Sequence, residues 1–503
     1  MKNKKISIGC VACLLTVLFA TMPVCAYTNM QAERNYTYNQ KGEAVYIPDA
    51  YEYAQALTLT DDKGVAAQNP QDFYIADDGK CYVADTDNNR ILVLDDKYQY
   101  VTQIAEITAP DGTVSNLNKP QGVFVYKNGD LMIADTMNHR LVQCDITGRA
   151  QRIIEKPAGL TGVSEEAIFL PSKVACDSAG RINVIATNIN FGLVQLDSEG
   201  IFLSYIGAPK VQTDWFTVFW RKFSTEAQKN QMVEFVATEY SNLFVDNSDL
   251  IWGTISTLDI EAFSTAIRSK DRSGSVTPIR LLNAMGNDVL KRNGQYAPLG
   301  DLSIKDADGD DSPSQIVDVA VGPGGIYSLL DKNRGHIFSY DTNGNLLYVF
   351  GSYGLRASDL QLPVAMAYRG DSLLVLDAGL GKIQMYTTTS YGKMVIKAVT
   401  EQYNGNFEEA NALWTDIAYQ NMNFVYAFEG LGSAQQSQKQ YTEALESYKY
   451  ATNTEYYSST FTLLRREKMK VYFPILFGVL LGLVVVVVLI KLIVKIRRFF
   501  KKY

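Results

Sequence analysis

Two stretches of the chain that lie fifty residues apart have nearly the same sequence. Residues 83–91 read VADTDNNRI, and residues 133–141 read IADTMNHRL. A segment that begins with Pro-Gln precedes each stretch, at Pro70 and Pro120, and short apolar runs alternate with Asp-Gly or Asn-Gly turns. Such runs and turns are typical of antiparallel hairpins. Repetition at this period in a β-rich sequence predicts a β-propeller.

Four weaker copies follow, beginning near residues 171, 242, 316 and 363. The segment from Tyr53 to Leu59 precedes the first copy and alternates weakly, as expected for an outer strand that closes the last blade. The sequence therefore predicts a mainly β fold, with a six-bladed propeller over residues 45–390. Closure of the ring leaves only short, protected strand edges.

The pattern Ala-Asp-Thr-x-Asn-x-Arg resembles the NHL-repeat family of β-propellers, which is named for an Asn-His-Leu tripeptide. The match is specific in the first two copies, where Asn138, His139 and Arg140 are followed by Leu141. The resemblance implies a platform that binds a partner or a ligand; a minority of these propellers are enzymes. Exported proteins with this plan resemble accessory components of bacterial envelope systems, including those beside sugar-uptake ABC transporters.

The period changes after the propeller. Residues 404–410 read NGNFEEA and residues 438–444 read QKQYTEA, and Trp414 is matched by Tyr448 thirty-four residues later. This spacing resembles tetratricopeptide repeats and predicts a small all-α module over residues 397–451. Because two helical hairpins leave apolar end faces, we expect the module to pack on the propeller or on a partner.

Both ends of the chain carry membrane signals. A basic start, an apolar run and Val24-Cys25-Ala26 predict a signal peptide over residues 1–26. A juxtamembrane helix is expected over 452–470, and the uncharged residues 471–490 are long enough to span roughly 30 Å of hydrocarbon. Six cations and no carboxylate predict a cytoplasmic tail over 491–503. We expect a single-pass type I protein of a bacterial cell membrane, with most of its mass outside.

The charge of the expected outer part is strongly negative. The whole chain has a net charge of −7, but without the three lysines of the signal and the six cations of the tail, 38 basic residues face 54 acidic ones, a net charge of −16. This excess argues against a nucleic-acid partner. Cys81, Cys144 and Cys176 fall in strand patterns of different copies and are interpreted as buried strand residues rather than a disulfide framework.

An aspartate ends the second strand of four copies, at Asp85, Asp135, Asp331 and Asp377. Arg90 and Arg140 follow the first two. Because a catalytic group would not be copied around a ring, we interpret these residues as structural, with the carboxylate accepting backbone N–H groups and the arginine bracing it. Ala186 and Thr254 stand at the aligned positions of copies three and four, and departures from an internal rule are places where function is often found.

The largest insertion, residues 208–238, is rich in aromatic residues and has helical spacing. It is either a helical flap packed on the ring or an exposed docking or substrate-covering surface. The candidates for a binding surface are Trp215, Phe216, Phe219, Trp220 and, in the fourth copy, Trp252.

One acidic segment resembles part of a calcium loop. Asp306, Asp308 and Asp310 alternate around Gly309, but the distal glutamate of an EF-hand is missing, and a solvated acidic turn is the alternative. Apart from this weak Ca²⁺ candidate, no cofactor is expected. With only two histidines, the chain cannot form the three-histidine zinc site of NHL-type amidating lyases.

Two hypotheses for function follow. The first is a membrane-anchored extracytoplasmic scaffold that binds protein partners at the outer membrane face, among them ABC transporter components, or carbohydrate. The second is a metal-dependent lactonase or sugar hydrolase that resembles gluconolactonase-like propellers, which hold a divalent cation with Glu, Asp and Asn in the channel. No glutamate of this sequence aligns with a strand end for that role.

Overall fold

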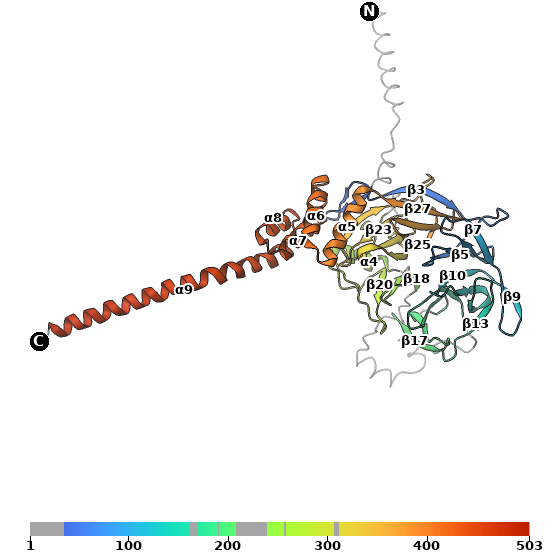
Figure 1. The fold of residues 1–503 in the computed structure, drawn as a ribbon, viewed down its shortest axis with the longest axis horizontal. Helices are drawn as coiled ribbons and strands as arrows, with labels where there is room; N and C mark the ends of the chain where they lie inside the picture. The colour runs from blue at the N-terminus through green and yellow to red at the C-terminus, as the bar shows by residue number, and fades with distance from the viewer. Residues whose placement is uncertain are drawn as a thin grey trace, which may run out of the picture.

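The computed structural model describes residues 35–160, 166, 168–189, 191–207, 239–255, 258–305 and 311–501. The expected signal peptide, the aromatic insertion 208–238 and residues 306–310 lie outside this part. The described chain forms a ring of six antiparallel blades, with a set of helices on one side and one long helix extending away from the ring (Figure 1). The predicted fold class, a six-bladed propeller followed by an α-helical region, is confirmed.

Blades one to three are regular four-stranded sheets. Blade one contains β4 (Asp72–Ile75), β5 (Cys81–Asp85), β6 (Arg90–Leu94) and β7 (Tyr100–Ile104). Blade two contains β10 (Pro120–Val125), β11 (Leu131–Asp135), β12 (Arg140–Cys144) and β13 (Ala150–Ile154). Blade three contains β14 (Pro171–Cys176), β15 (Ile182–Ala186), β16 (Leu193–Leu196) and β17 (Phe202–Ile206). The hairpin of β8 (Glu106–Thr108) and β9 (Val114–Asn116) joins the first two blades.

Blades four and five depart from this plan. In the described residues blade four has three strands, β18 (Tyr240–Val245), β19 (Ile251–Ile255) and β20 (Ile279–Leu282), with helix α4 (Ile260–Ser269) between the last two. Blade five contains β21 (Ile316–Val321), β22 (Tyr327–Asp331), β23 (Ile337–Tyr340) and β24 (Leu346–Phe350). The N-terminal strands β1 (Tyr36–Tyr38) and β2 (Ala44–Tyr46) extend its outer edge, which the sequence had not indicated.

Blade six closes the ring with a strand from the start of the chain. Strands β25 (Pro363–Arg369), β26 (Ser372–Asp377) and β27 (Lys382–Thr388) pair in order, and β3 (Tyr51–Thr58) pairs antiparallel with β27. This is the closing strand that the sequence predicted at Tyr53–Leu59. The outer strand of blade six thus comes from the start of the chain and the other three from the end of the ring, which joins both ends of the ring in one sheet.

Each blade packs between two others, and this explains the continuous apolar runs of the sequence. All five residues of β5 and of β11 are buried. Ile91 and Val93 of blade one share a core cluster with Val123 and Ile133 of blade two. A strand covered on both faces does not need the polar alternation of a half-exposed strand.

Five helices follow the ring. They are α5 (Ser390–Asn404), α6 (Phe407–Gln420), α7 (Val425–Ser437), α8 (Tyr441–Tyr450) and α9 (Thr454–Phe500). We call α5 to α8 with the first turns of α9 the helical module. Phe407 and Tyr441 begin α6 and α8, so the thirty-four-residue period corresponds to the helix pairs α6–α7 and α8–α9. The second pair therefore uses the beginning of the long helix.

The helical module packs on the last two blades. Thr389 caps α5 directly after β27, and Val395 and Trp414 belong to the same buried cluster as Tyr348 of blade five and Leu373 of blade six. The turn η2 (Pro323–Gly325) of blade five lies against α5. A Cβ at Gly324 would lie 2.2 Å from Oγ1 of Thr400, so only glycine permits this approach.

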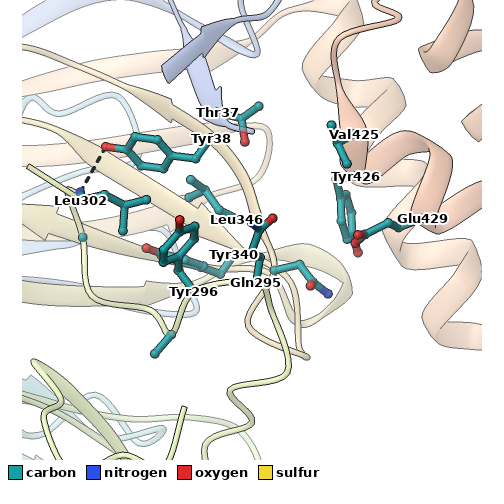
Figure 2. A pocket seen from close by; sticks show the side chains of 13 residues that line it. Thr37, Tyr38, Gln295, Tyr296, Leu302, Tyr340, Leu346, Val425, Tyr426 and Glu429 are labelled. Carbon is teal, nitrogen blue, oxygen red and sulfur yellow. Dashed lines mark hydrogen bonds between the residues drawn. The ribbon is translucent and has the colours of Figure 1, made fainter. Parts of the chain in front are cut away.

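Helix α7 faces blade five across a small hollow (Figure 2). Val425, Tyr426 and Glu429 lie on its helical side, and Tyr38 and Leu346 lie on its strand side. The hydroxyl of Tyr426 donates to Oδ2 of Asp341, 2.5 Å away, in the turn between β23 and β24. Polar and apolar contacts thus hold the helices on the ring together.

Helix α9 changes character along its length. Its first turns pack against α8, and Thr460 is fully buried. From Val471 onward the apolar side chains are about half exposed. This is one helix long and apolar enough to span a membrane, judged by length and composition. The expected span 471–490 lies within it.

Candidate functional site

The repeated aspartate of blade one ties three segments together. Asp85 is fully buried, and its Oδ1 accepts the backbone N–H of Gln68 at 2.7 Å, from the segment that leads into the blade. Its Oδ2 accepts Nε of Arg90 at 2.7 Å and Nδ2 of Asn88 at 2.8 Å. Blade two repeats this arrangement with Asp135, Arg140 and Asn138.

The threonine of the motif links neighbouring blades. Oγ1 of Thr86 donates to the carbonyl of Pro120, and Oγ1 of Thr136 donates to the carbonyl of Pro171, both at 2.7 Å. Each proline begins the inner strand of the next blade. The motif that resembles a family signature therefore has a geometric role in this chain, because it fastens each blade to its connection and to the blade that follows.

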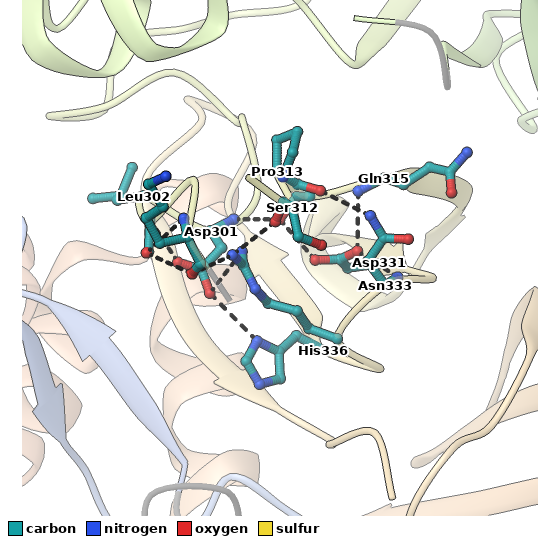
Figure 3. A network of polar contacts seen from close by, with 12 residues as sticks. Asp301, Leu302, Ser312, Pro313, Gln315, Asp331, Asn333 and His336 are labelled. Carbon is teal, nitrogen blue, oxygen red and sulfur yellow. Dashed lines mark hydrogen bonds and ion pairs between the residues drawn. The ribbon is translucent and has the colours of Figure 1, made fainter. Parts of the chain in front are cut away.

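Blade five keeps the aspartate but uses the basic residue differently (Figure 3). Asp331 accepts the hydroxyl of Ser314 and the backbone N–H of Gln315. Arg334 pairs instead with Asp301 at 3.3 Å, and Nδ1 of His336 lies 3.6 Å from the same carboxylate. Burial opposes the charge of Asp301, but His336 and Arg334 hold its pKa below the usual range.

Blade six and blade four show two more variants. Asp377 accepts the backbone N–H groups of Gln361, Leu362 and Leu380. In blade four the residue that pairs across to the start of the inner strand is Ile255, because Tyr240 pairs with Ile255 as Pro120 pairs with Asp135. The sequence alignment that placed Thr254 there is wrong by one residue. The offset from Tyr240 to Ile255 equals that from Pro120 to Asp135, but the inner strand of blade four begins with Tyr240, so no proline marks its start in the sequence.

A second ring of residues lies at the channel, two positions after the start of each repeat. These residues pair with the penultimate residue of the second strand: Asp72, Gly122, Lys173, Asn242, Asp318 and Ala365. Four of these residues, in blades one, three, four and five, have side chains that can form hydrogen bonds. They are two carboxylates, one ammonium group and one amide. In the sequence these residues stand two places after Pro70, Pro120 and Pro171. Their side chains differ from copy to copy, so no repeated letter marks the position.

Lys173 of blade three crosses to blade one. Its Nζ lies 3.0 Å from Oδ1 of Asp72 and donates to the carbonyl of Gln71 at 2.6 Å. Gly122 of the intervening blade makes room, since a Cβ there would lie 2.7 Å from the carbonyl oxygen of Ser172. Burial raises the pKa of Asp72, and Lys173 opposes that rise. The ion pair spans one blade and ties three blades together.

Asp318 is a buried carboxyl of the channel with its own partners. Its Oδ1 accepts the N–H of Val319 at 2.7 Å, and its Oδ2 accepts the N–H of Met366 of blade six at 2.5 Å. Burial raises its pKa to about 7, although these two N–H groups and Lys173 favour the charged form. Such a raised pKa is found at functional sites and also in structural networks.

The channel holds a cavity of about 170 Å³. Asp72, Asn242 and Asp318 line it together with aromatic side chains, among them Tyr74 and Tyr368. In the described part of the chain, no group of three or more His, Cys, Asp or Glu side chains could hold a metal ion. Each channel carboxylate already bonds to a lysine or to backbone N–H groups, so these carboxylates form their hydrogen bonds within the ring.

The aromatic candidates are divided by the structure. Trp252 is buried, packs at 5.0 Å against the ring of Tyr327 and donates from Nε1 to Asp246 at 3.0 Å. Its indole is therefore a core group of blades four and five and is not open to a ligand. Four other aromatic candidates, and the three aspartates of the calcium-loop candidate, lie outside the described residues: Trp215, Phe216, Phe219, Trp220, Asp306, Asp308 and Asp310.

No protein-family model and no curated protein matches the chain. Among solved structures it is similar to virginiamycin B lyase from Staphylococcus aureus, with 13% identity, a TM-score of 0.40, and coverage of 67% of this chain and 100% of that chain. It is also similar to the extracellular domain of a one-component system from Bacteroides thetaiotaomicron, with 12% identity, a TM-score of 0.35, and coverage of 70% and 40%. These likenesses are distant and concern the fold alone.

Proposed function

We propose that the chain is a membrane-anchored extracytoplasmic scaffold that binds partners through its propeller and its helical repeats. The observation that carries the proposal is the continuous packing of ring, helical module and long helix. A single buried cluster joins blades five and six to α5, α6 and α7. A module joined in this way holds the ring at a set place relative to the anchor, which is what a scaffold at a membrane surface needs.

Polar contacts at the same joint add to this packing. Nδ2 of Asn421 donates to the carbonyl of Tyr46, the last residue of strand β2, at 3.4 Å. Oε1 of Gln436 in α7 accepts the hydroxyl of Thr460 in α9 at 2.7 Å. The contacts therefore run from the ring through α7 to the start of the long helix.

The finer parts of the proposal come from sequence. The resemblance to NHL and tetratricopeptide repeats supports a binding role for both parts of the chain. The expected signal peptide and the basic tail support an outer location with protein partners at the outer membrane face, an accessory role beside an envelope or sugar-uptake system.

The proposal is tested by purifying the full chain, with an affinity tag after Tyr503, from gently solubilised native membranes. We expect a membrane complex of defined stoichiometry, identified by cross-linking and mass spectrometry. A matched preparation with an unrelated single-pass protein carrying the same tag is the control. Purification of the chain alone under conditions that keep other membrane complexes intact would contradict the proposal.

A further inference from the structure

Three adjoining hollows lie where blade five, the helical module and the start of α9 meet. The smallest, about 60 Å³, is the hollow of Figure 2, and the others measure about 400 and 310 Å³. Asn345 and Glu429 line all three. We call this set of hollows the junction cleft. Clefts between domains that measure roughly 300–1,000 Å³ are common places for small-molecule sites.

The two shared residues have hydrogen-bonding capacity left over. Oε1 of Glu429 accepts Nδ2 of Asn453 at 2.9 Å, and within the described residues no hydrogen bond or ion pair involves its Oε2. Nδ2 of Asn345 donates to Asp341 at 2.9 Å, while its side-chain oxygen has no such contact within the same residues. Both side chains are half-buried. A carboxylate and an amide thus meet in a partly enclosed space with acceptors to spare.

Amides, hydroxyls and tyrosines make up most of the remaining wall. Gln295 and Asn293 come from the segment between blades four and five, and Gln402 and Ser433 come from α5 and α7. The rings of Tyr448 and Tyr456, with centroids 5.5 Å apart, border the hollow of about 310 Å³. Tyrosine combines an apolar face with a polar tip, and amides both donate and accept.

The charges near the cleft balance one another. Arg272 lies 3.9 Å from Glu455, and Nζ of Lys270 donates to the carbonyl of Gln40 and lies 4.8 Å from the centroid of the Tyr296 ring. Both cations and both glutamates, Glu455 and Glu429, line the same hollow. A wall of mixed sign gives no strong attraction to an anion or to a cation, and it favours a neutral ligand that forms many hydrogen bonds.

From this geometry we infer that the junction cleft is a binding site for a neutral polyhydroxylated ligand, a saccharide. Hydroxyl groups both donate and accept, as the amides of the wall require, and sugar rings lay their C–H faces on tyrosine. A hydroxyl bond to the carboxylate of Glu429 would be charge-assisted and hence stronger than a neutral bond.

The environment of Glu429 supports this site. Burial raises its pKa to about 7, and the neighbouring Asp341 carboxylate adds to the rise, while Asn453 opposes it. Tyr426 and Tyr456 are the titratable side chains beside it on α7 and α9, and Arg272 and Lys270 are the cations of the shared wall. A carboxylate that burial disfavours gains from a ligand that supplies hydroxyl donors.

The site goes beyond the proposed scaffold function, because it names a ligand and a place that partner binding does not require. It rests on the proposed function only for the outer location, where envelope glycans are found. A binding experiment on the purified chain is independent of that location, so failure of one proposal can be told from failure of the other.

The test uses the full chain in detergent and three neutral probes, maltohexaose, cellohexaose and chitohexaose, with binding followed by native mass spectrometry. Ser459 and Ser458 are adjacent exposed residues of α9, and the hydroxyl of each donates to a carbonyl of its own helix. Only Ser459 lines the cleft. Ser459→Trp therefore fills the cleft, and Ser458→Trp is its matched control.

We expect at least one probe to bind, Ser459→Trp to weaken it about tenfold or more, and Ser458→Trp to leave it within about twofold. At a pH of about 8, where the carboxyl of Glu429 is ionised, Glu429→Gln should also weaken binding, since it removes the charge but keeps the shape and the bond from Asn453. Three outcomes would overturn the inference: no probe binds the parent chain, both tryptophan variants bind equally, or binding survives Ser459→Trp. A membrane complex that still co-purifies in those cases would leave the scaffold proposal standing.

Discussion

The channel of the propeller and the junction cleft both contain polar side chains, but they use them in opposite ways. In the channel, Lys173 is bonded to Asp72 and both oxygens of Asp318 accept backbone N–H groups. In the cleft, Glu429 and Asn345 each keep an acceptor without a contact among the described residues. A polar group that is already bonded stabilises the protein, whereas one without a partner can gain a hydrogen bond from a ligand. The channel is therefore suited to stability and the cleft to ligand binding.

The difference has a topological origin. Channel residues sit at a position that recurs in every blade, so a side chain there can reach a counterpart in another blade, as Lys173 reaches Asp72. The cleft is formed where blade five meets α7 and α9, a junction that the chain makes only once. A unique junction has no repeated partner, and segments far apart in the sequence supply its walls.

The largest expected effect is loss of folding in the isolated helices. The fragment 397–451 lacks the first half of α5 and the blade residues that complete its core, since Trp414 is fully buried in a cluster shared with the ring. We expect circular dichroism to show a poorly folded fragment, while the ectodomain 27–470 melts in one step. A stable monomeric fragment, together with two separate ectodomain transitions, would show that the parts are independent.

The channel ion pair should be costly to break from one side. Asp72→Ala leaves the buried ammonium of Lys173 without its carboxylate, and removal of one partner of a buried pair typically costs about 3–5 kcal/mol. Chemical denaturation of the full chain in detergent measures this. Replacing both partners, as in Asp72→Leu with Lys173→Met, should recover much of the loss. Equal losses in the single and the double variant would argue against a paired role.

The cleft should show a pH effect through Glu429. In the folded chain the carboxyl keeps its proton up to a pH of about 7, whereas the unfolded chain releases it near the ordinary value. The folded state then binds more protons in this window, so its contribution to stability falls as pH rises through it.

Glu429→Gln keeps the acceptor for Asn453 and removes the titration. The melting temperature of the variant minus that of the parent should therefore increase between pH of about 5 and about 8. Asp318 shifts stability in the same direction in both proteins and cancels in this difference. A difference that stays constant across the range would mean that Glu429 does not titrate there.

The smallest stability effect is expected for the aromatic insertion. We predict that alanine at exposed members of the group from Trp215 to Phe223 weakens partner or ligand binding with little change in melting temperature. A loss of roughly 3–5 kcal/mol, as for a core aromatic, would show a packed flap instead. Binding to the co-purified partner and thermal denaturation measure the two quantities on the same variants.

The ring could be predicted from sequence because its contacts are repeated in sequence. The pair of Asp85 and Arg90 and that of Asp135 and Arg140 make the same bonds in two blades, so the repeated letters correspond to a repeated geometry. The closing strand was predicted for a similar reason, because its pattern continued that of a blade. Blade four was harder, since its inner strand begins with Tyr240 in place of a proline and α4 separates its last two strands.

The junction cleft could not be predicted in this way. Tyr296, Asn345, Glu429 and Tyr456 lie in four segments with no common pattern, and only tertiary packing brings them together. The length of α9 was also missed, because Thr454 to Lys470 reads as a separate polar helix when the apolar span is considered alone. Its first turns complete the second helix pair of the module.

We expect the ring, the helical module and the start of α9 to form one rigid unit, because one buried cluster joins blades five and six to the module. Spin labels at Val101→Cys, an exposed position of β7, and Ser458→Cys, an exposed position of α9, report it directly in the full chain. Cys10, Cys13 and Cys25 lie in the expected signal peptide and would be removed with it, and Cys81, Cys144 and Cys176 are buried and should not react. A pulsed dipolar measurement should give a single narrow distance distribution. A broad or two-peaked distribution would show that the ring moves relative to the start of α9, and that the two are not one rigid unit.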